Sequence, residues 1–178
     1  TTTSLSNMTG FIGAKIVSNK NIAVNTGNYL GSIAGDGSQD AGMVQIVPTA
    51  LLGTEHVVVE GGGGPILERP LIVATANATI VYLNNIVAPI TILNEGDYFL
   101  VPESYYSGSL HKNMVVKTSK PAYVFQCTAA TTNSATSEFN FIPPLECYLT
   151  DFIDAIPDID RIGPTVFTGI LYVITVSG

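Results

Sequence analysis

The sequence predicts an all-β protein with little helix, built from antiparallel β-sandwich or barrel-like units, and three observations lead to this fold class. Apolar segments are short and rich in Val, Ile, Thr and Tyr, which favours strands. Gly, Pro, Asn or Asp bounds nearly every segment, at intervals of about ten residues, as is typical of sandwiches and barrels. Two stretches of the chain also repeat one pattern, which indicates that the β units are duplicated.

The repeat is clearest between residues 15–24 and residues 115–124, which lie 100 positions apart. Each copy has an apolar run, a short polar segment with Lys at the same place, and a second apolar run that ends in Val. We therefore expect two strands joined by a tight turn in both copies. Three further matches follow in the same order, the first two at 96 positions and the last at 100: residues 46–48 with 142–144, 54–57 with 150–153, and 71–75 with 171–175. Without a duplication, these matches would reflect only the general likeness of β-strands.

The repeat predicts a first β unit at residues 1–110 and a second, incomplete unit of the same kind at residues 111–178. The second copy stops before any counterpart of residues 79–101. The chain also begins at Thr1, without Met or a signal-like segment. Both features predict a fragment of a longer polypeptide, so the remainder of that polypeptide is an expected partner of the module.

The individual strands are predicted from short apolar runs between turn residues. In chain order these runs are residues 14–17, 43–47, 56–60, 71–75, 79–83, 90–93, 98–101, 114–117, 122–127 and 139–142. Asn84 and Asn85 suit the tight turn of a hairpin because Asn tolerates positive φ. Residues 94–97 predict the next reversal. Apolar residues at helical spacing after two prolines predict a helical turn within residues 145–153, with a shorter one at residues 48–53.

The composition excludes several classes of protein. Seven Lys and Arg against fourteen Asp and Glu give a formal net charge of −7 and leave no basic surface for nucleic acid. No apolar run approaches the length of a membrane span, about 18 residues. Only 12% of the residues are charged and 46% are apolar, and Thr, Asn, Ser and Gly are frequent. This profile predicts an extracellular protein, either secreted or on the cell surface.

Two cysteines, Cys127 and Cys147, are candidates for a disulfide bond. Neither belongs to a CxxC motif and the chain has only two His, so a zinc site is disfavoured. Closing a loop of about twenty residues would contribute roughly 3 kcal/mol to stability. Two buried free thiols are the alternative.

Acidic residues and glycosylation sequons supply further candidate sites. Asp158 and Asp160 are candidate calcium ligands, because calcium prefers loop carboxylates. Their spacing is not that of an EF-hand, so a solvated acidic loop is the alternative, and no other cofactor is expected. Asn7 and Asn77 each begin an N-x-Thr sequon, which matters only in a source that glycosylates Asn.

The sequence disfavours catalysis. No serine lies in a nucleophile elbow, and His56 occupies a strand position where the second copy has Phe152, which predicts packing and not acid–base chemistry. A glycosidase built on Glu55 and Glu60 would depend only on two acids in one strand. The glycine run at residues 61–64 lacks the Lys and Ser/Thr of a phosphate-binding loop and predicts a flexible loop.

Strands, Lys-containing turns and Ile-x-Pro motifs follow one another in a fixed order along most of the chain. The segments that carry this order are residues 16–27, 45–58, 71–81, 93–101, 114–126 and 140–144. The order resembles the N-terminal domain of the IgGFc-binding protein family. The resemblance implies an extracellular β-rich binding module, of the kind found in mucin-associated proteins of animals and in large secreted or surface proteins of bacteria. With only two cysteines, the chain is closer to the bacterial members.

These observations together predict a non-catalytic adhesion or structural module that binds protein or glycan on another surface. Free strand edges add the expectation of homo-oligomers. Tyr105 and Tyr106 form an aromatic pair able to stack on a sugar, with burial at a strand end as the alternative. Two further functions stay open: a lectin-like carbohydrate-binding domain, which the absence of Trp disfavours, and a self-assembling fibre or surface-layer subunit.

Overall fold

The computed structural model describes residues 11–31, 40–129, 135–145, 161–166, 171, 173 and 174. In this part the chain is all-β, as predicted, with two short 3-10 helices and no α-helix. Among these described residues, no helix has the length and hydrophobicity needed to cross a membrane. The chain divides into two compact units, Thr1–Leu145 and Glu146–Gly178. The described strands of the second unit are β10 (Arg161–Ile162) and β11 (Thr165–Val166), which pair with each other.

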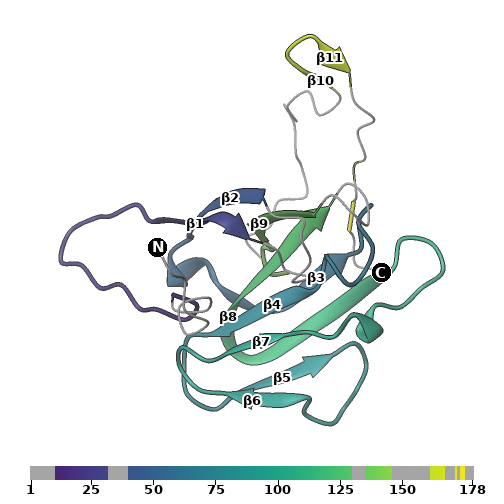
Figure 1. Cartoon of the computed structure of the whole chain (residues 1–178). Helices are drawn as coiled ribbons and strands as arrows, with labels where there is room; N and C mark the ends of the chain where they lie inside the picture. Colours follow the sequence, from purple (N-terminus) through teal and green to yellow (C-terminus); the bar gives the residue numbers. More distant parts are fainter. Residues whose placement is uncertain are drawn as a thin grey trace. The chain divides into compact units, whose positions relative to one another are not determined.

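The first unit contains a small sheet and a large one, both antiparallel (Figure 1). The small sheet pairs β1 (Asn25–Gly31) with β2 (Asp40–Gln45). The strands of the large sheet are β3 (Gly53–Val59), β4 (Pro70–Ala74), β5 (Thr79–Leu83), β6 (Thr91–Leu93), β7 (Tyr98–Leu100), β8 (Asn113–Ala129) and β9 (Ala135–Phe141). Their order is β6-β5-β8-β4-β7, and β3 and β9 also pair with β8. The barrel-like sheet is thus organised around β8.

β8 is one strand of 17 residues with a sharp bend near its middle, and not the two strands and tight turn that its pattern predicted (Figure 1). The first half of β8, residues 113–117, pairs with β3 and β5. The second half, residues 122–129, pairs with β4 and β9. Between Gly53 and Glu55 of β3 the partner on β8 shifts from Ala122 to Lys117, so residues 118–121 form a bulge relative to β3, although Thr118 still pairs with Val81 of β5. A bulge bends a strand without ending its pairing, which explains the difference from the prediction.

Alternate residues of β4 and β8 face two separate cores. On the inner face, Ile72 and Val124 join a large apolar cluster and are both 0% exposed. On the outer face, Leu71 and Phe125 pack with Val44 of β2 and with aromatic residues of β9. Because both faces of β4 are covered, all five of its residues are buried. The β1–β2 hairpin therefore acts as a second layer over this part of the large sheet.

The predicted boundary near residue 110 falls inside the large sheet. β8 follows this boundary in sequence, yet it lies between β5 and β4, which precede it. In the described part of the chain, the strands on the two sides of residue 110 therefore make one sheet and not two separate units.

The predicted turns were partly correct. Asn84 adopts φ of 53° at the β5–β6 turn, and Gly96 adopts φ of 86° in the reversal after β6. A 3-10 helix, η2 (Thr49–Leu51), occupies the shorter of the two predicted helical turns. The longer one, at residues 145–153, lies outside the described residues except for Leu145, whose N–H donates to the Glu55 carbonyl at 2.7 Å.

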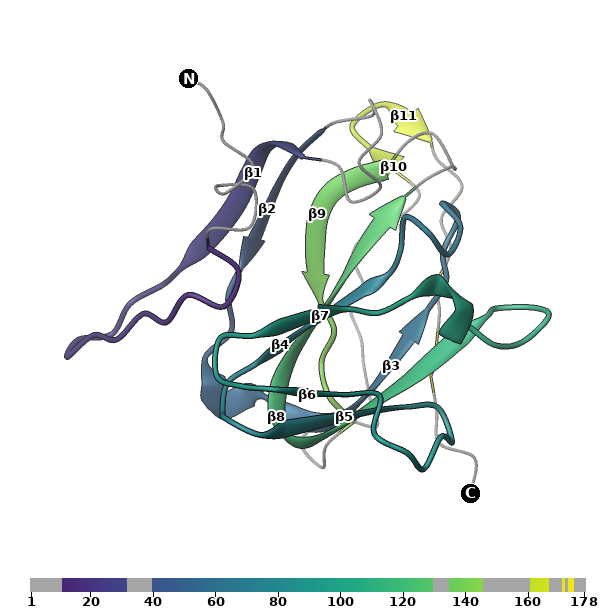
Figure 2. The ribbon, with the colours of Figure 1, turned by 60° about the horizontal axis from the view of Figure 1, so that its bottom comes forward.

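Residues 15–24, here called the arm, contain no strand, although residues 14–17 were predicted to form one. The base of the arm is fixed, because Lys15 Nζ lies 2.6 Å from Glu95 Oε1 and Ile46 N–H donates to the Val24 carbonyl at 2.9 Å. Gly13, just before the arm, lies close to Gly96. A Cβ added to Gly13 would be 1.9 Å from the carbonyl oxygen of Gly96. Between these contacts the chain forms a loop that projects from the sheet, drawn in dark purple in Figure 2.

Candidate binding surface

Three loops gather at one end of the large sheet, here called the loop end: residues 60–69, 84–90 and 101–112. They lie together because β3 ends, β5 ends and β8 begins at this edge. The cross-strand pairs Val59 with Asn113 and Leu83 with Val116 fix this arrangement. Binding residues are often carried on loops that a rigid sheet positions in this way.

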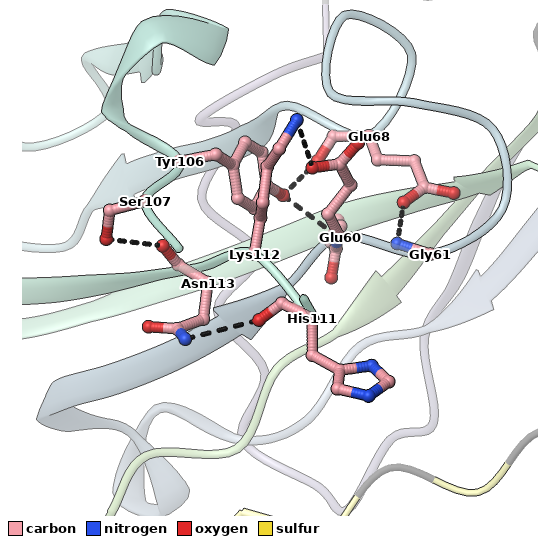
Figure 3. A network of polar contacts seen from close by, with 9 residues as sticks. Glu60, Gly61, Glu68, Tyr106, Ser107, His111, Lys112 and Asn113 are labelled. Carbon is pink, nitrogen blue, oxygen red and sulfur yellow. Dashed lines mark hydrogen bonds and ion pairs between the residues drawn. The ribbon is translucent and has the colours of Figure 1, made fainter. Parts of the chain in front are cut away.

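The carboxylate of Glu68 organises the first loop. Glu68 is 1% exposed, and it accepts a hydrogen bond from the Gly61 N–H (Figure 3). It also accepts one from the Gly63 N–H at 3.1 Å. A Cβ on Gly61 would lie 2.9 Å from Glu68 Oε1, so a larger residue at this position would displace the carboxylate. The glycine run at residues 61–64, predicted to be a flexible loop, is thus the binding site of a carboxylate from the same chain.

Tyr106 connects this loop to the sheet. Its hydroxyl donates to the Glu68 carbonyl at 2.7 Å and accepts from Gln126 Nε2 at 3.0 Å. Gln126 Nε2 also donates to the Val59 carbonyl at 2.8 Å. Burial, with smaller contributions from the negative charges of Glu68 and Glu60, raises the pKa of Tyr106 well above its ordinary value. The phenol therefore stays protonated and keeps its role as a donor.

The other two loops are held by asparagine and lysine side chains. Asn84 Nδ2 donates to the Tyr105 carbonyl at 2.8 Å, while its Oδ1 accepts the Val115 N–H at 3.0 Å. Lys112 Nζ lies 3.5 Å from Glu60 Oε2, and the Glu60 N–H donates to the Lys112 carbonyl at 2.8 Å. His111 adopts φ of 52° just before this contact. These bonds hold the bases of all three loops while their outer residues face solvent.

The outer residues of the loop end include large apolar side chains. Val87 is 91% exposed and Leu110 is 81% exposed, and Ile66 and Ile86 are also exposed. Apolar side chains presented on a polar, rigid framework favour contact with another macromolecule. We therefore take the loop end as the candidate binding surface.

The aromatic pair that the sequence suggested is not available as a pair. Tyr106 is 9% exposed and lies in the inner core, and Tyr105 is half-buried against the same cluster. Tyr106 directly follows the 3-10 helix η3 (Glu103–Tyr105) and not a strand, and its hydroxyl has two hydrogen-bond partners inside the protein. In this conformation Tyr106 offers no face to a sugar.

The remaining predicted sites are only partly described. Cys127 is 1% exposed on β8, and burial raises the pKa of its thiol to about 12. Its predicted disulfide partner Cys147, the calcium candidates Asp158 and Asp160, and the sequon residue Asn7 lie outside the described residues. Asn77 is exposed in a turn, where its Oδ1 accepts the Glu95 N–H at 3.0 Å. The third sequon residue, Thr79, is 0% exposed and donates its hydroxyl to the Ala76 carbonyl at 2.7 Å.

The residues considered for catalysis have different surroundings, although two of them are adjacent on β3. Glu55 pairs with Lys117 at 3.0 Å, and His56 is 0% exposed on the inner face of β3. Burial lowers the pKa of His56 to about 4, and neither ring nitrogen has a hydrogen-bond partner. In the part of the chain that the structure describes, no group of three or more His, Cys, Asp or Glu is placed to hold a metal ion.

Sequence reasoning did not identify Glu68, Gln126, Val87 or Leu110 as parts of a site. A glutamate eight residues after Glu60, in a loop between apolar residues, was the available signal for Glu68. The carboxylate could not be connected with the glycine run without knowing how the loop closes. Val87 and Leu110 carried the signal of apolar residues between strands, since such residues are exposed unless the loop folds back.

A family model described as IgGFc binding protein matches residues 2–170, nearly the whole chain. The match includes the large sheet, the β1–β2 hairpin and all three loops of the loop end. Comparison with the curated proteins and with the solved structures gives no match.

Proposed function

The chain belongs to the IgGFc-binding protein family, and from this premise we propose that it is a non-catalytic extracellular module that binds a protein partner through the loop end. The module would serve adhesion within a larger secreted or cell-surface polypeptide. The observation that carries the proposal is the family match, which extends over residues 2–170. The name of the family indicates a protein ligand, the Fc part of immunoglobulin G.

The arrangement of the loop end supports binding to a protein. Val87 and Leu110 present apolar surface at the outer part of two loops, while the Glu68 and Asn84 contacts hold the loop bases. A framework that is already ordered loses little conformational entropy when a partner binds. Exposed apolar side chains on such a framework can act as the few residues that dominate the affinity of an interface.

The surroundings of the acidic residues support a role without catalysis. Glu55 and Glu60 are each paired with a different lysine, and Glu68 is bonded to backbone amides. General acid–base catalysis needs such groups to face a substrate within hydrogen-bond reach. Here the carboxylates serve contacts within the protein.

The experiment is a binding measurement between the immobilised chain and purified Fc fragment, with the Fab fragment as the control ligand. We expect saturable binding of Fc that persists after enzymatic removal of the Fc glycan. Val87→Asp and Leu110→Asp should each weaken binding by about tenfold or more, because a charge would replace an apolar contact. The matched control is Val17→Asp, since Val17 is 81% exposed but lies in the arm.

Three outcomes would contradict the proposal in different ways. Absence of Fc binding would remove Fc as the partner. Binding that disappears with the glycan would favour the lectin-like alternative. Equal losses in Val17→Asp and Val87→Asp would show that the loop end is not the binding surface.

A further inference from the structure

The exposed residues of the loop end carry no formal charge. Its three loops lie wholly within residues 40–129, which the structure describes without a gap. The exposed residues of these loops include no Asp, Glu, Lys or Arg, and they are Gly62, Ile66, residues 85–89, Ser104 and residues 107–111. On a chain with a formal net charge of −7, the outermost positions of the loop end are thus apolar or small and polar, together with His111.

The five charged residues of the three loops are buried or half-buried. Glu68 is 1% exposed and is bonded to the amides of the glycine run. Lys112 Nζ lies 3.5 Å from Glu60 Oε2, so these two charges oppose each other, although the lysine side chain is 43% exposed. Arg69 Nε donates to a backbone carbonyl of its own loop at 3.0 Å. The fifth, Glu103, is half-buried at the start of η3. Charge is therefore kept away from the outermost positions.

The opposite end of the large sheet has a different surface. Residues 75–78 and 94–97 form turns at this end, because β5 begins and β6 ends there. Glu95 and Asp97 are exposed in these turns, which the structure describes in full, and none of their exposed residues is a large apolar one. The lack of charge at the loop end is therefore a local property, and it does not simply follow from the composition of the chain.

Backbone hydrogen bonds hold the segment that carries Leu110. Ser107 and Asn113 exchange two backbone hydrogen bonds of 2.9 Å each, which closes the residues between them into a short loop. Asn113 Nδ2 also donates to the His111 carbonyl at 3.3 Å (Figure 3). Leu110 is 81% exposed on this loop. Because bonds within the chain already close the loop, a partner can cover Leu110 at little cost in conformational entropy.

On the basis of the proposed function, in which the loop end binds a protein, we propose that its partner presents an apolar patch without charged side chains. The contact would bury Val87 and Leu110 among small polar groups, as in the core of an interface, where charged residues are rare. A charged side chain of another protein would lose its water here and would meet no exposed residue of opposite charge. The loop end therefore selects against charged surfaces of either sign.

A random-peptide library displayed on phage tests this chemistry without Fc as the probe. The library is selected on the immobilised chain, and the enriched peptides are compared for binding to the double variant Val87→Asp/Leu110→Asp. We expect peptides with apolar side chains and no net charge, which lose about tenfold or more in affinity for the double variant. The matched control is Val17→Asp, which changes the exposed arm and should leave their affinity unchanged.

Three results of the selection would overturn the proposal. The first is enrichment of peptides that carry a net charge. The second is a set of peptides that bind the double variant as tightly as the unsubstituted chain, which would assign their site to another surface. The third is the absence of any enriched peptide.

Charges of opposite sign at one position provide a second test, with purified Fc fragment as the probe. Ser109 is exposed and directly precedes Leu110. Ser109→Lys and Ser109→Glu should each weaken binding by about fivefold or more, since an uncharged patch gains from neither sign. Ser109→Asn is the uncharged control and should change the dissociation constant by less than about twofold. Raising the salt concentration from about 0.05 M to about 0.5 M should also change it by less than about twofold.

The outcomes with Fc distinguish the chemistry of the partner patch from the proposed function. Tighter binding in one of the two charge variants would show a partner patch of the opposite charge, which would overturn the proposal while protein binding would stand. Marked weakening by salt, or no effect of either charge, would overturn it as well. Absence of Fc binding would instead contradict the proposed partner, and the peptide selection would then decide the chemistry of the loop end.

Discussion

The arm and β8 carry the same sequence pattern but have different structures. In β8, residues 115–124 pair with strands on both edges, and the inward residues Val116 and Val124 are 0% exposed. In the arm, Ile16 and Val17 are 63% and 81% exposed, and the backbone forms a projecting loop. The difference shows that an apolar run with β-branched residues becomes a strand only where neighbours supply hydrogen bonds and a covered face.

The turn segment that β8 and the arm share also differs in structure between them. In β8, residues 118–121 make a bulge that carries the strand from one pair of neighbours to another. The counterpart in the arm, residues 18–21, lies in the projecting loop. A bent strand and a loop can therefore come from similar turn residues, because neighbouring strands decide whether pairing continues through them.

The largest effect is expected from matched alanine substitutions at equivalent positions. Val116→Ala should lower the free energy of unfolding by about 2 kcal/mol, because it leaves a cavity in the inner core. Ile16→Ala should change it by less than about 0.5 kcal/mol, because the side chain is exposed. Urea unfolding followed by circular dichroism measures both. Equal losses of unfolding free energy would mean that the arm is as well packed as β8, which would contradict the structural difference between them.

A smaller effect concerns pH and the strand beside β8. His56 of β3 lies opposite Val116, and the repeat places Phe152 at the equivalent position. Burial lowers the pKa of His56 from 6.5 to about 4, while the neighbouring Glu55 opposes the shift. Between pH 6.5 and about pH 4, His56 therefore binds a proton in the unfolded chain but stays neutral in the folded chain. The stability that depends on neutral His56 is fully present above pH 6.5 and is lost as the pH falls towards 4.

The expected loss is about 2 kcal/mol between pH 7 and pH 5. His56→Phe, which copies the residue of the other repeat, should remove this part of the pH dependence. Urea midpoints at the two pH values measure it in both proteins. If the two proteins lose the same stability on acidification, His56 is not the group responsible.

The smallest effect is expected at the base of the arm. Lys15 Nζ and Glu95 Oε1 are 2.6 Å apart, but both side chains are largely exposed. Lys15→Gln should therefore change the free energy of unfolding by less than about 0.5 kcal/mol, and added salt should remove the difference. The measurement is the urea midpoint at low and high salt. A larger loss would show that the arm is held more firmly than its exposed residues suggest.

Much of the local structure could be predicted from the sequence. The bounds of β5 coincide with the predicted strand at residues 79–83, because alternating burial and the Asn84 turn mark its ends. The 3-10 turn of η2 after Pro48 was predicted for a similar reason, since proline favours the start of such a turn. Local chemistry was sufficient at these positions.

The features that required tertiary contacts could not be predicted. No local pattern indicates that β8 pairs with β3, β4, β5 and β9, so the sequence suggested a boundary at residue 110 where the structure has one sheet. The role of Glu68 likewise depends on the closure of the glycine loop around its carboxylate. Burial of Tyr106 follows from its bond to the Glu68 carbonyl, 38 residues away in sequence. Each of these depends on residues distant in sequence.

The position of β8 in the sheet sets the order in which the protein can be assembled during synthesis. β3, β4 and β5 emerge from the ribosome first, yet each pairs with β8, which follows them in the chain. Until residue 129 has been made, these strands lack their shared neighbour and their inner core stays open. Pairing over such sequence separations is slow, because loop closure must precede the contacts that reward it. The strands that precede β8 would therefore remain unfolded, and dependent on protection from aggregation, until β8 has been made.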